Sequence, residues 1–113
     1  MFGKKGNGGK KPTKQHFRRG KSTNKGHPTY IYAKVGNELK YVGITHAEIT
    51  DGTKNIKLDK NPNPDDNKPS YIRPAPDKAD ISKFGRRLPT WKFAETDKGK
   101  VKSVIKKDKD KKT

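Results

Sequence analysis

Apolar and polar residues alternate most regularly in the second quarter of the chain. Residues 29–35 (TYIYAKV) are rich in β-forming side chains, residues 36–39 (GNEL) offer a turn, and residues 40–45 (KYVGIT) continue the alternation. This pattern predicts a β-hairpin. A loop over 36–39 separates apolar from polar side chains better than a two-residue loop over 36–37, so we expect the former register. It places Ile31, Ala33, Val35, Val42 and Ile44 on one face, and Tyr30, Tyr32, Lys34 and Tyr41 on the other.

Shorter runs downstream predict one to three further strands. Residues 54–58 alternate, and residues 70–73 precede a proline as an edge strand does. Residues 61–66 contain two prolines and are expected to form a loop, because proline cannot donate to a ladder or continue a helix. Residues 90–93 form either a last strand or an anchor for the core. The aromatic side chains assigned to the core are Phe84, Trp91 and Phe93.

The pattern changes to a helical period near the C-terminus. Thr96 is a suitable N-cap, and Asp97 is favourable in the first turn of a helix. Gly99 lowers helix stability by about 1 kcal/mol relative to alanine. One face of this predicted helix carries Val101, Val104 and Ile105.

Together these elements predict an α+β fold. The expected core is small and β-rich, made of the hairpin plus one to three short strands, and a C-terminal helix follows it. Residues 1–26 contain few large apolar groups, too few to offset the entropy of ordering the chain. The expected organisation is therefore a disordered basic arm over 1–26, a domain over 27–106 and a disordered tail over 107–113.

Charge is concentrated at the two ends of the chain. The formal net charge is +17, and residues 1–26 hold nine Lys or Arg and no Asp or Glu. Residues 100–113 carry a net charge of +5, while residues 27–99 carry only +3. Such a distribution predicts a polyanionic partner, and nucleic acid is the first choice.

Composition excludes several classes of protein. The chain has no cysteine, so disulfides and thiolate metal sites are excluded. No apolar run is long enough for a secretory signal or a membrane span, so we expect a cytoplasmic protein with no membrane partner. Nothing in the sequence indicates a small-molecule substrate or a cofactor.

The basic residues near the N-terminus are the first candidates for phosphate contact. Lysine and arginine release counterions from nucleic acid when they bind phosphates, and the interspersed glycines let the arm follow a groove. The alternative is a run of charge that only keeps the protein in solution. These candidates are Lys4, Lys5, Lys10, Lys11, Lys14, Arg18, Arg19, Lys21 and Lys25.

The tyrosines of the predicted hairpin are the second candidates. Tyr30, Tyr32 and Tyr41, with Lys34 beside them, are positioned in the expected register to form a platform on which unpaired bases stack. The alternative, which we favour because the chain has few aliphatic residues, is that these rings belong to the core.

A third group of cations lies in the second half of the domain. A guanidinium on a loop can meet a phosphate or a base edge. The alternative, left open here, is that Arg86 and Arg87 are only a pair of surface arginines that face Asp77 and Asp80. The members of this group are Arg73, Lys83, Arg86 and Arg87.

No spacing of side chains indicates catalysis or a metal site. The three histidines, His16, His27 and His46, match no known ligand spacing. The dense aspartates near residue 65 are explained by turns. We therefore predict no catalytic residue and no metal ligand.

One short motif resembles a known family. Tyr30-Ile31-Tyr32, followed after eight residues by Tyr41-Val42-Gly43, is similar to the paired strand motifs of the GIY-YIG nucleases. The resemblance covers about 15 residues and implies that Tyr32 and Tyr41 activate water and position a phosphate. The chain departs from that family because Tyr30 stands where a glycine is expected, and residues 46–67 contain no arginine for the following helix.

These observations favour a small, basic, non-catalytic protein that binds DNA or RNA through backbone phosphates with weak sequence specificity. The first alternative is an interaction module of a ribonucleoprotein or another protein assembly. The second alternative is a divergent GIY-YIG-like nuclease.

Overall fold

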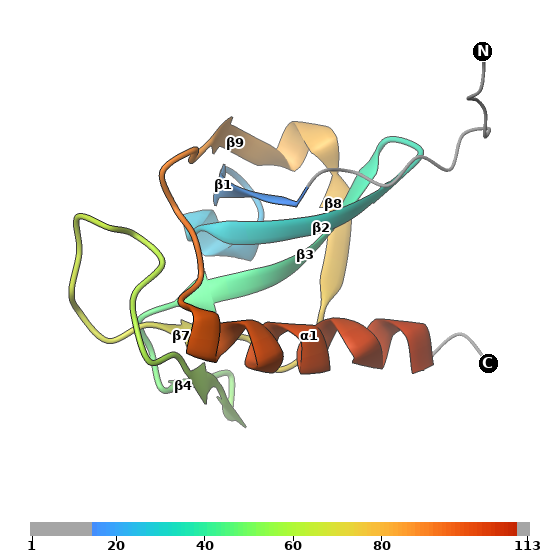
Figure 1. Cartoon of the computed structure of the whole chain (residues 1–113). Coiled ribbons are helices and arrows are strands. Elements are labelled where there is room, and N and C mark those ends of the chain that lie inside the picture. The colour runs from blue at the N-terminus through green and yellow to red at the C-terminus, as the bar shows by residue number, and fades with distance from the viewer. Residues whose placement is uncertain (1–14, 111–113) are drawn as a thin grey trace, which may run out of the picture.

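The structure is a computed structural model that describes residues 15–110, with side chains up to residue 108. It contains a mostly antiparallel sheet and one C-terminal helix, so the predicted α+β class is confirmed (Figure 1). Part of the predicted arm lies outside the described residues, and with it five candidate cations. These are Lys4, Lys5, Lys10, Lys11 and Lys14.

The main sheet has seven strands, joined in the order β6-β7-β3-β2-β1-β9, and β8 also pairs with β3. A separate two-stranded ribbon joins β4 to β5. The strands are β1 His16–Gly20, β2 Thr29–Val35, β3 Glu38–Thr45, β4 Ile49–Thr50, β5 Thr53–Lys54, β6 Ile56–Lys57, β7 Tyr71–Ile72, β8 Asp77–Asp80 and β9 Phe84–Arg87. The helices are the 3₁₀ turns η1 Asn24–Gly26 and η2 Ile81–Lys83, and α1 Glu95–Asp110.

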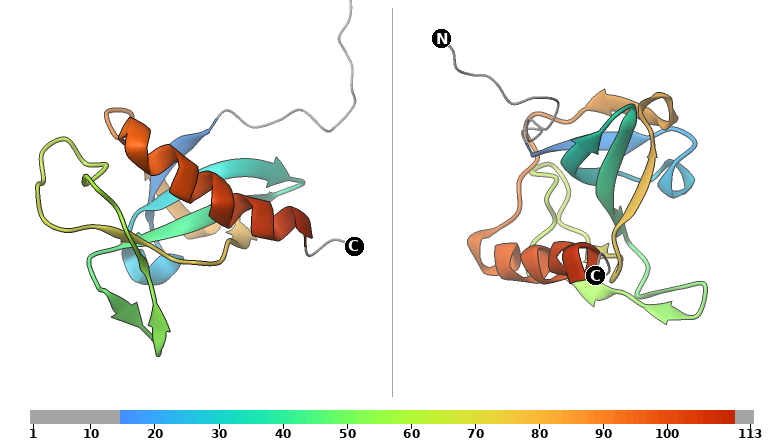
Figure 2. Two further views of the ribbon diagram at one scale, coloured as in Figure 1. Left: turned by 60° about the horizontal axis from the view of Figure 1, so that its bottom comes forward. Right: turned by 90° about the vertical axis from the view of Figure 1, so that its right-hand side faces the viewer.

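The segment β8–η2–β9 crosses from one side of the sheet to the other. β8 pairs with the first half of β3, and β9 pairs with β1. η2 is fixed between them, because Ile81 donates its N–H to the carbonyl of Asn37 at 2.8 Å, and Lys21 donates to the carbonyl of Lys83 at 3.1 Å. The strands β9-β1-β2-β3-β8 therefore curl around a small interior (Figure 2).

Both faces of the central strands are covered. The inner core lies within the curl and consists of Ile31, Leu39, Tyr41 and Phe84, with Ala79 against them. The helix-side core lies on the opposite face, under α1 and the segment that precedes it. Its buried members are Phe17, Val42, Ile44, Leu58, Ile72, Leu88, Phe93, Val101 and Val104.

Two aspartates of α1 attach the helix to the rest of the fold. Asp97 is fully buried, and its carboxylate accepts hydrogen bonds from the backbone N–H of Asp59 at 2.7 Å and of Lys60 at 3.1 Å. Asp108 accepts from the Tyr32 hydroxyl at 3.1 Å and from the Lys40 ammonium at 3.0 Å. α1 begins at Glu95, one residue before the predicted N-cap. Across residues 15–110, no helix has the length and apolar character needed to cross a membrane.

The predicted domain boundaries are corrected at both ends. His16–Gly20 is a central strand and not part of a disordered arm, because Phe17 is 4 % exposed in the helix-side core and β1 is paired on both sides. At the other end α1 continues to Asp110, past the expected boundary at residue 106. The contacts of Asp108 hold this last part of the helix.

The expected hairpin register is wrong. The two-residue turn over 36–37 pairs Val35 with Glu38, and a bulge between Ile31 and Ala33 shifts the register farther along. Gly36 makes this turn favourable, because its φ of 62° suits the first central position of a type II′ turn. Separation of apolar from polar side chains does not identify the register of this hairpin, because both of its faces are buried.

The remaining strand predictions had mixed outcomes. The strand expected over 54–58 is divided into β5 and β6, and β7 lies within the segment 70–73. Residues 90–93 form no strand and anchor the core through Phe93, the second of the two alternatives.

Candidate nucleic-acid interface

Strands β1 and β9 bring together cations from two distant parts of the sequence. Arg18 lies opposite Arg87 in the ladder, and the carbonyl of Lys83 accepts the N–H of Lys21. All of the side chains in this group are exposed except that of Arg18, which is partly buried. We call this group the cationic strip: Arg18, Arg19, Lys21, Lys83, Arg86 and Arg87.

The pair Arg18–Arg87 places like charges across two adjacent strands. Arg18 donates from Nη1 to the carbonyl of Gly85 at 3.2 Å and from Nε to His16 Nε2 at 3.1 Å. Burial, and then the charge of Arg87, lower the pKa of Arg18. Like charges directly opposite each other destabilise a sheet. A bound anion at this position would remove the repulsion.

The alternative for Arg86 and Arg87, a pairing with Asp77 and Asp80, is not formed. Asp80 instead caps η2, where its carboxylate accepts the backbone N–H of Ser82 at 2.9 Å. The side chain of Asp77 interacts with Tyr41. Within residues 15–108, no carboxylate is in ion-pair contact with a member of the cationic strip, although the charge of Lys83 contributes, after Ser82, to lowering the pKa of Asp80.

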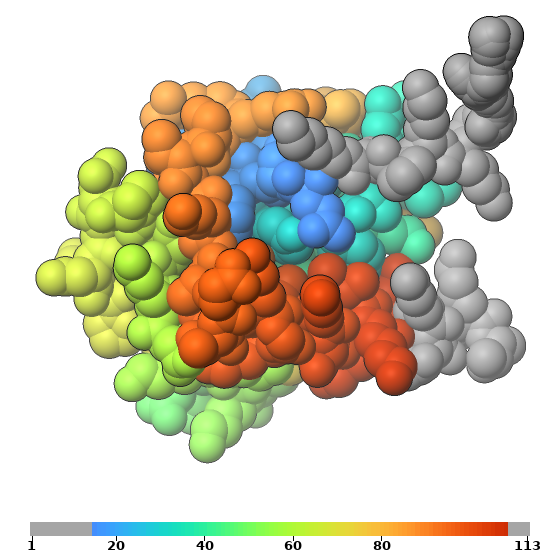
Figure 3. All heavy atoms as spheres, viewed as in Figure 1, coloured from blue at the N-terminus to red at the C-terminus, as the bar shows by residue number. Residues whose placement is uncertain are grey.

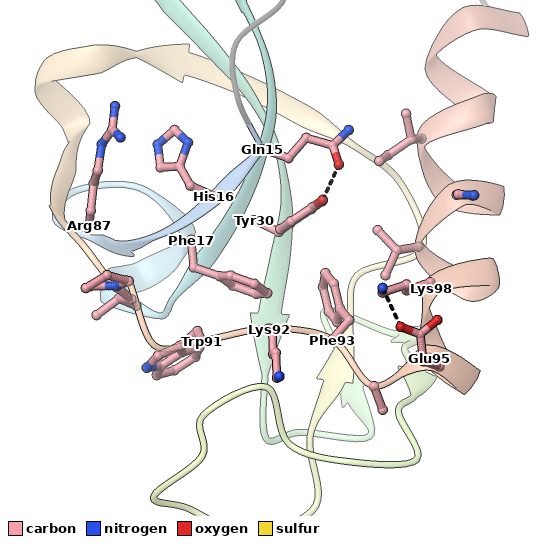
Figure 4. Close-up of a pocket in the computed structure, with 16 residues that line it drawn as sticks. Gln15, His16, Phe17, Tyr30, Arg87, Trp91, Lys92, Phe93, Glu95 and Lys98 are labelled. Carbon is pink, nitrogen blue, oxygen red and sulfur yellow. Dashed lines mark hydrogen bonds and ion pairs between the residues drawn. The ribbon is translucent and has the colours of Figure 1, made fainter.

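A groove of about 780 Å³ adjoins the strip between β1, the segment 88–94 and α1. Figure 3 shows β1 (blue) at the surface, between the segment that precedes α1 (orange) and α1 itself. Four aromatic rings line the groove at centroid separations of 4.8–5.9 Å, and Figure 4 shows how they lie. They are Phe17, Tyr30, Trp91 and Phe93.

Positive side chains surround these rings. The lining contains one carboxylate, Glu95, whose oxygen accepts from the Lys98 ammonium at 2.7 Å. Arg87 belongs both to the groove and to the cationic strip, so the two features form one surface. The cations that line the groove are Arg87, Lys92, Lys98 and Lys102, and His16 lies beside Arg87 (Figure 4).

The three tyrosines of the hairpin do not form a common platform. Tyr30 lines the groove, and Tyr32 packs on the same side of the sheet. Tyr41 lies in the inner core, where its ring meets Phe84 edge-on at 5.4 Å. The corrected register is the reason, since it pairs Tyr30 with Val42 and turns Tyr41 to the other face. Lys34 is exposed near the end of the hairpin.

Arg73 is separated from the other members of its predicted group. Its Nη1 donates to Asn55 Oδ1 at 2.9 Å and to the carbonyl of Thr50 at 3.3 Å, so it supports the β4–β5 ribbon. It lines a second hollow of about 680 Å³ together with Lys25, which pairs with Asp51 at 3.6 Å. The guanidinium of Arg73 therefore has a structural role in supporting the ribbon.

The two tyrosines named by the nuclease resemblance belong to different cores. Tyr32 packs against the helix-side core and Tyr41 lies in the inner core, while the charge of Asp77 contributes to raising the pKa of both hydroxyls. Among residues 15–108, no three His, Asp or Glu side chains gather as they do around a metal ion. In comparisons with known proteins, no family model, curated protein or solved structure matched the chain.

Several residues of this surface were not identified from the sequence. The sequence assigns Trp91 to the core, and its ring does pack against the helix-side core, but it is also partly exposed in the groove. The sequence does not single out three lysines that also line the groove, Lys92, Lys98 and Lys102. The sequence does contain one signal for this surface, because Lys92 stands between Trp91 and Phe93 and so places a cation next to two rings. Phe17 lines the groove from β1, a strand that the local sequence pattern does not reveal.

Tyr41 provides a test of the inner core through pH. Burial, and then Asp77, raise the pKa of Tyr41 to about 12 from an unperturbed value of 10.0. The neutral phenol therefore stabilises the fold fully below pH 10, and this contribution is lost as the pH rises toward 12. We expect wild type to be more stable than Tyr41→Phe at pH 8, and the difference in urea midpoint to shrink by pH 11.5.

The comparison with Tyr41→Phe is the control, because the other tyrosines ionise in both proteins. A difference in urea midpoint that stays constant from pH 8 to pH 11.5 would contradict the buried, carboxylate-facing position of the Tyr41 hydroxyl.

Proposed function

We propose that this protein binds nucleic acid, DNA or RNA, mainly through backbone phosphates, with weak sequence specificity and without catalysis. The observation that carries the proposal is the Arg18–Arg87 pair, which the fold holds on two adjacent strands. Among the described residues, no carboxylate forms an ion pair with either arginine. Such repulsion destabilises the free protein and is relieved by a phosphate anion. The exposed neighbours of the pair extend the positive surface along β1 and β9.

The lysines that precede the described residues add to this proposal. The chain enters the domain at Gln15, which lines the groove, and the preceding fourteen residues include five lysines and no acid. This segment joins the domain beside the proposed phosphate surface. Each further phosphate contact strengthens binding and steepens its dependence on salt.

The test is a salt titration of a strip variant. A protein with Arg19, Arg86 and Arg87 changed to Gln keeps the partly buried Arg18 and loses three exposed charges. Its affinity for a labelled oligonucleotide is measured by fluorescence anisotropy between 50 and 300 mM KCl. Each lost phosphate contact reduces the slope of log K against log salt by about 0.9 for a duplex and about 0.7 for a single strand, so we expect a slope smaller by about 2–3.

A second triple variant is the matched control. Lys54, Lys57 and Lys68 are exposed on β5, β6 and the loop before β7, away from β9, and their change to Gln removes the same charge. This control should reduce the slope by less than one phosphate contact. Equal effects of the two variants, or an affinity independent of salt, would refute a phosphate surface on the strip.

One observation favours the alternative of an interaction module in a ribonucleoprotein or other assembly. Val35 is 58 % exposed and Ile81 is 36 % exposed. The two lie at the same end of the molecule, because Ile81 donates its N–H to the carbonyl of Asn37 in the turn after Val35. Weak binding to free oligonucleotides together with copurification in a large assembly would favour this alternative.

The nuclease alternative has its own test. An oligonucleotide incubated with the protein and Mg²⁺ is expected to be recovered intact, and its cleavage would favour the nuclease.

A further inference from the structure

The groove beside the cationic strip presents aromatic rings that are held in place from behind. Tyr30 and Trp91 are partly exposed, whereas Phe17 and Phe93 are buried in the helix-side core. Phe17 contacts the ring of Tyr30 at a centroid distance of 5.0 Å and that of Trp91 at 5.9 Å. Phe93 meets Tyr30 edge-on at 4.8 Å. The two exposed rings are therefore fixed before any ligand binds, which lowers the entropy lost on binding.

Positive side chains from three parts of the fold line the groove together with these rings. Arg87 lies beside His16 on the strand side, Lys92 lies on the connecting segment and Lys98 on α1 (Figure 4). Lys102 of α1 also lines the groove. The single lining carboxylate, Glu95, is already paired with Lys98. The described lining side chains therefore carry an excess of positive charge around an aromatic surface.

This combination favours one kind of nucleic acid over another. Aromatic side chains bind bases by stacking, and stacking requires an unpaired base whose ring face is free. In a duplex each base is covered by its neighbours. The groove, at about 780 Å³, has the size of a site for a small ligand, so a single base fits in it. A flexible single strand can insert a base there and place its flanking phosphates on the surrounding cations.

We infer that the groove binds unpaired bases of a single strand, stacked on Trp91 and Tyr30, so that the protein prefers single-stranded nucleic acid to duplex. This inference rests on the proposed function, since the strip and the lysines at the N-terminus supply the phosphate contacts. In this scheme the groove distinguishes single-stranded from double-stranded nucleic acid, and the cationic strip provides most of the binding affinity.

The single tryptophan of the chain makes the groove directly observable. The full-length protein is titrated at one salt concentration with a ten-nucleotide single strand and with a ten-base-pair duplex. The single strand should quench Trp91 emission and bind about tenfold more tightly than the duplex, because only an unpaired base can stack on the exposed rings. The duplex should leave the emission largely unchanged.

Variants separate stacking from charge. Trp91→Leu should lose about tenfold in affinity for the labelled single strand, as expected for one stacked base, and less than twofold for the duplex. Trp91→Phe keeps a ring and should retain most of the preference, provided that thermal unfolding shows both variants folded. The double change Arg19→Gln and Arg86→Gln should weaken both probes by the same factor.

The possible outcomes are distinct. If both probes bind equally, with steep salt dependence and no change in Trp91 emission, the inference fails and the proposed function stands. If neither probe binds, both fail. If polyglutamate quenches Trp91 as strongly as the single strand does, the groove binds acidic peptides and the inference is overturned.

Discussion

Phe17→Ala is expected to lower the free energy of unfolding by about 3–5 kcal/mol. Phe17 is 4 % exposed and contacts three other rings, at centroid distances of 4.9–5.9 Å. Removing its ring leaves a cavity at the point where β1 and the segment before α1 meet. Domains of this size have a total stability of about 5–15 kcal/mol, so a large part of the stability would be lost.

The measurement is urea unfolding followed by circular dichroism. Arg19→Ala, two residues along the same strand and exposed, is the matched control and should change stability by less than about 0.5 kcal/mol. Equal stabilities of Phe17→Ala and Arg19→Ala would show that β1 is not part of the folded domain. Because β1 completes the sheet, a truncation meant to test the N-terminal lysines has to stop before residue 15.

Asp97→Ala is expected to cost about 3 kcal/mol of stability. The Asp97 carboxylate is fully buried and accepts two backbone N–H groups, those of Asp59 and Lys60. It also accepts the ammonium of Lys100 at 3.0 Å. Alanine would leave these donors without their acceptor and would detach the start of α1 from the segment after β6.

Asp59 offers a comparison at the same ammonium. Its exposed carboxylate also accepts from Lys100 at 3.0 Å and from the side chain of Thr96 in the first turn of α1, but unlike Asp97 it is exposed and accepts no backbone N–H from residues 59–60. Asp59→Ala should therefore lower the urea midpoint far less than Asp97→Ala does. If the two variants are equally destabilised, the buried position of Asp97 is not what fixes the helix.

The elements with strong periodic signals could be predicted from the sequence. The hairpin and α1 follow from a period of two and a period of about 3.6, and the α+β class follows from them. β1 is not evident from the sequence because HFRRG has one apolar residue among five. That residue, Phe17, is held by three rings that are distant in the sequence. β8, with the sequence DKAD, carries no apolar alternation and is specified by its pairing with β3.

The candidate site was predictable in composition but not in arrangement. Clustered arginines in the sequence indicated Arg86 and Arg87, yet their partner Arg18 comes from a strand that local pattern does not reveal. The bulge near Tyr32 changes which side chains share a face, and no turn signal in the hairpin marks it. The pairing of β1 with β9 and the one-residue shift at the bulge therefore decide which side chains share a face, and local sequence patterns reveal neither.

The pairing of β1 with β9 also bears on how the protein is made. During translation the first strand leaves the ribosome long before β9, which ends at Arg87, and before the valines of α1 that cover the same core. Until then the nascent chain exposes Phe17 and has no partner for one side of β1, a condition that favours aggregation. Co-expressed chaperones, which shield exposed apolar groups during this interval, are therefore expected to raise the yield of folded recombinant protein.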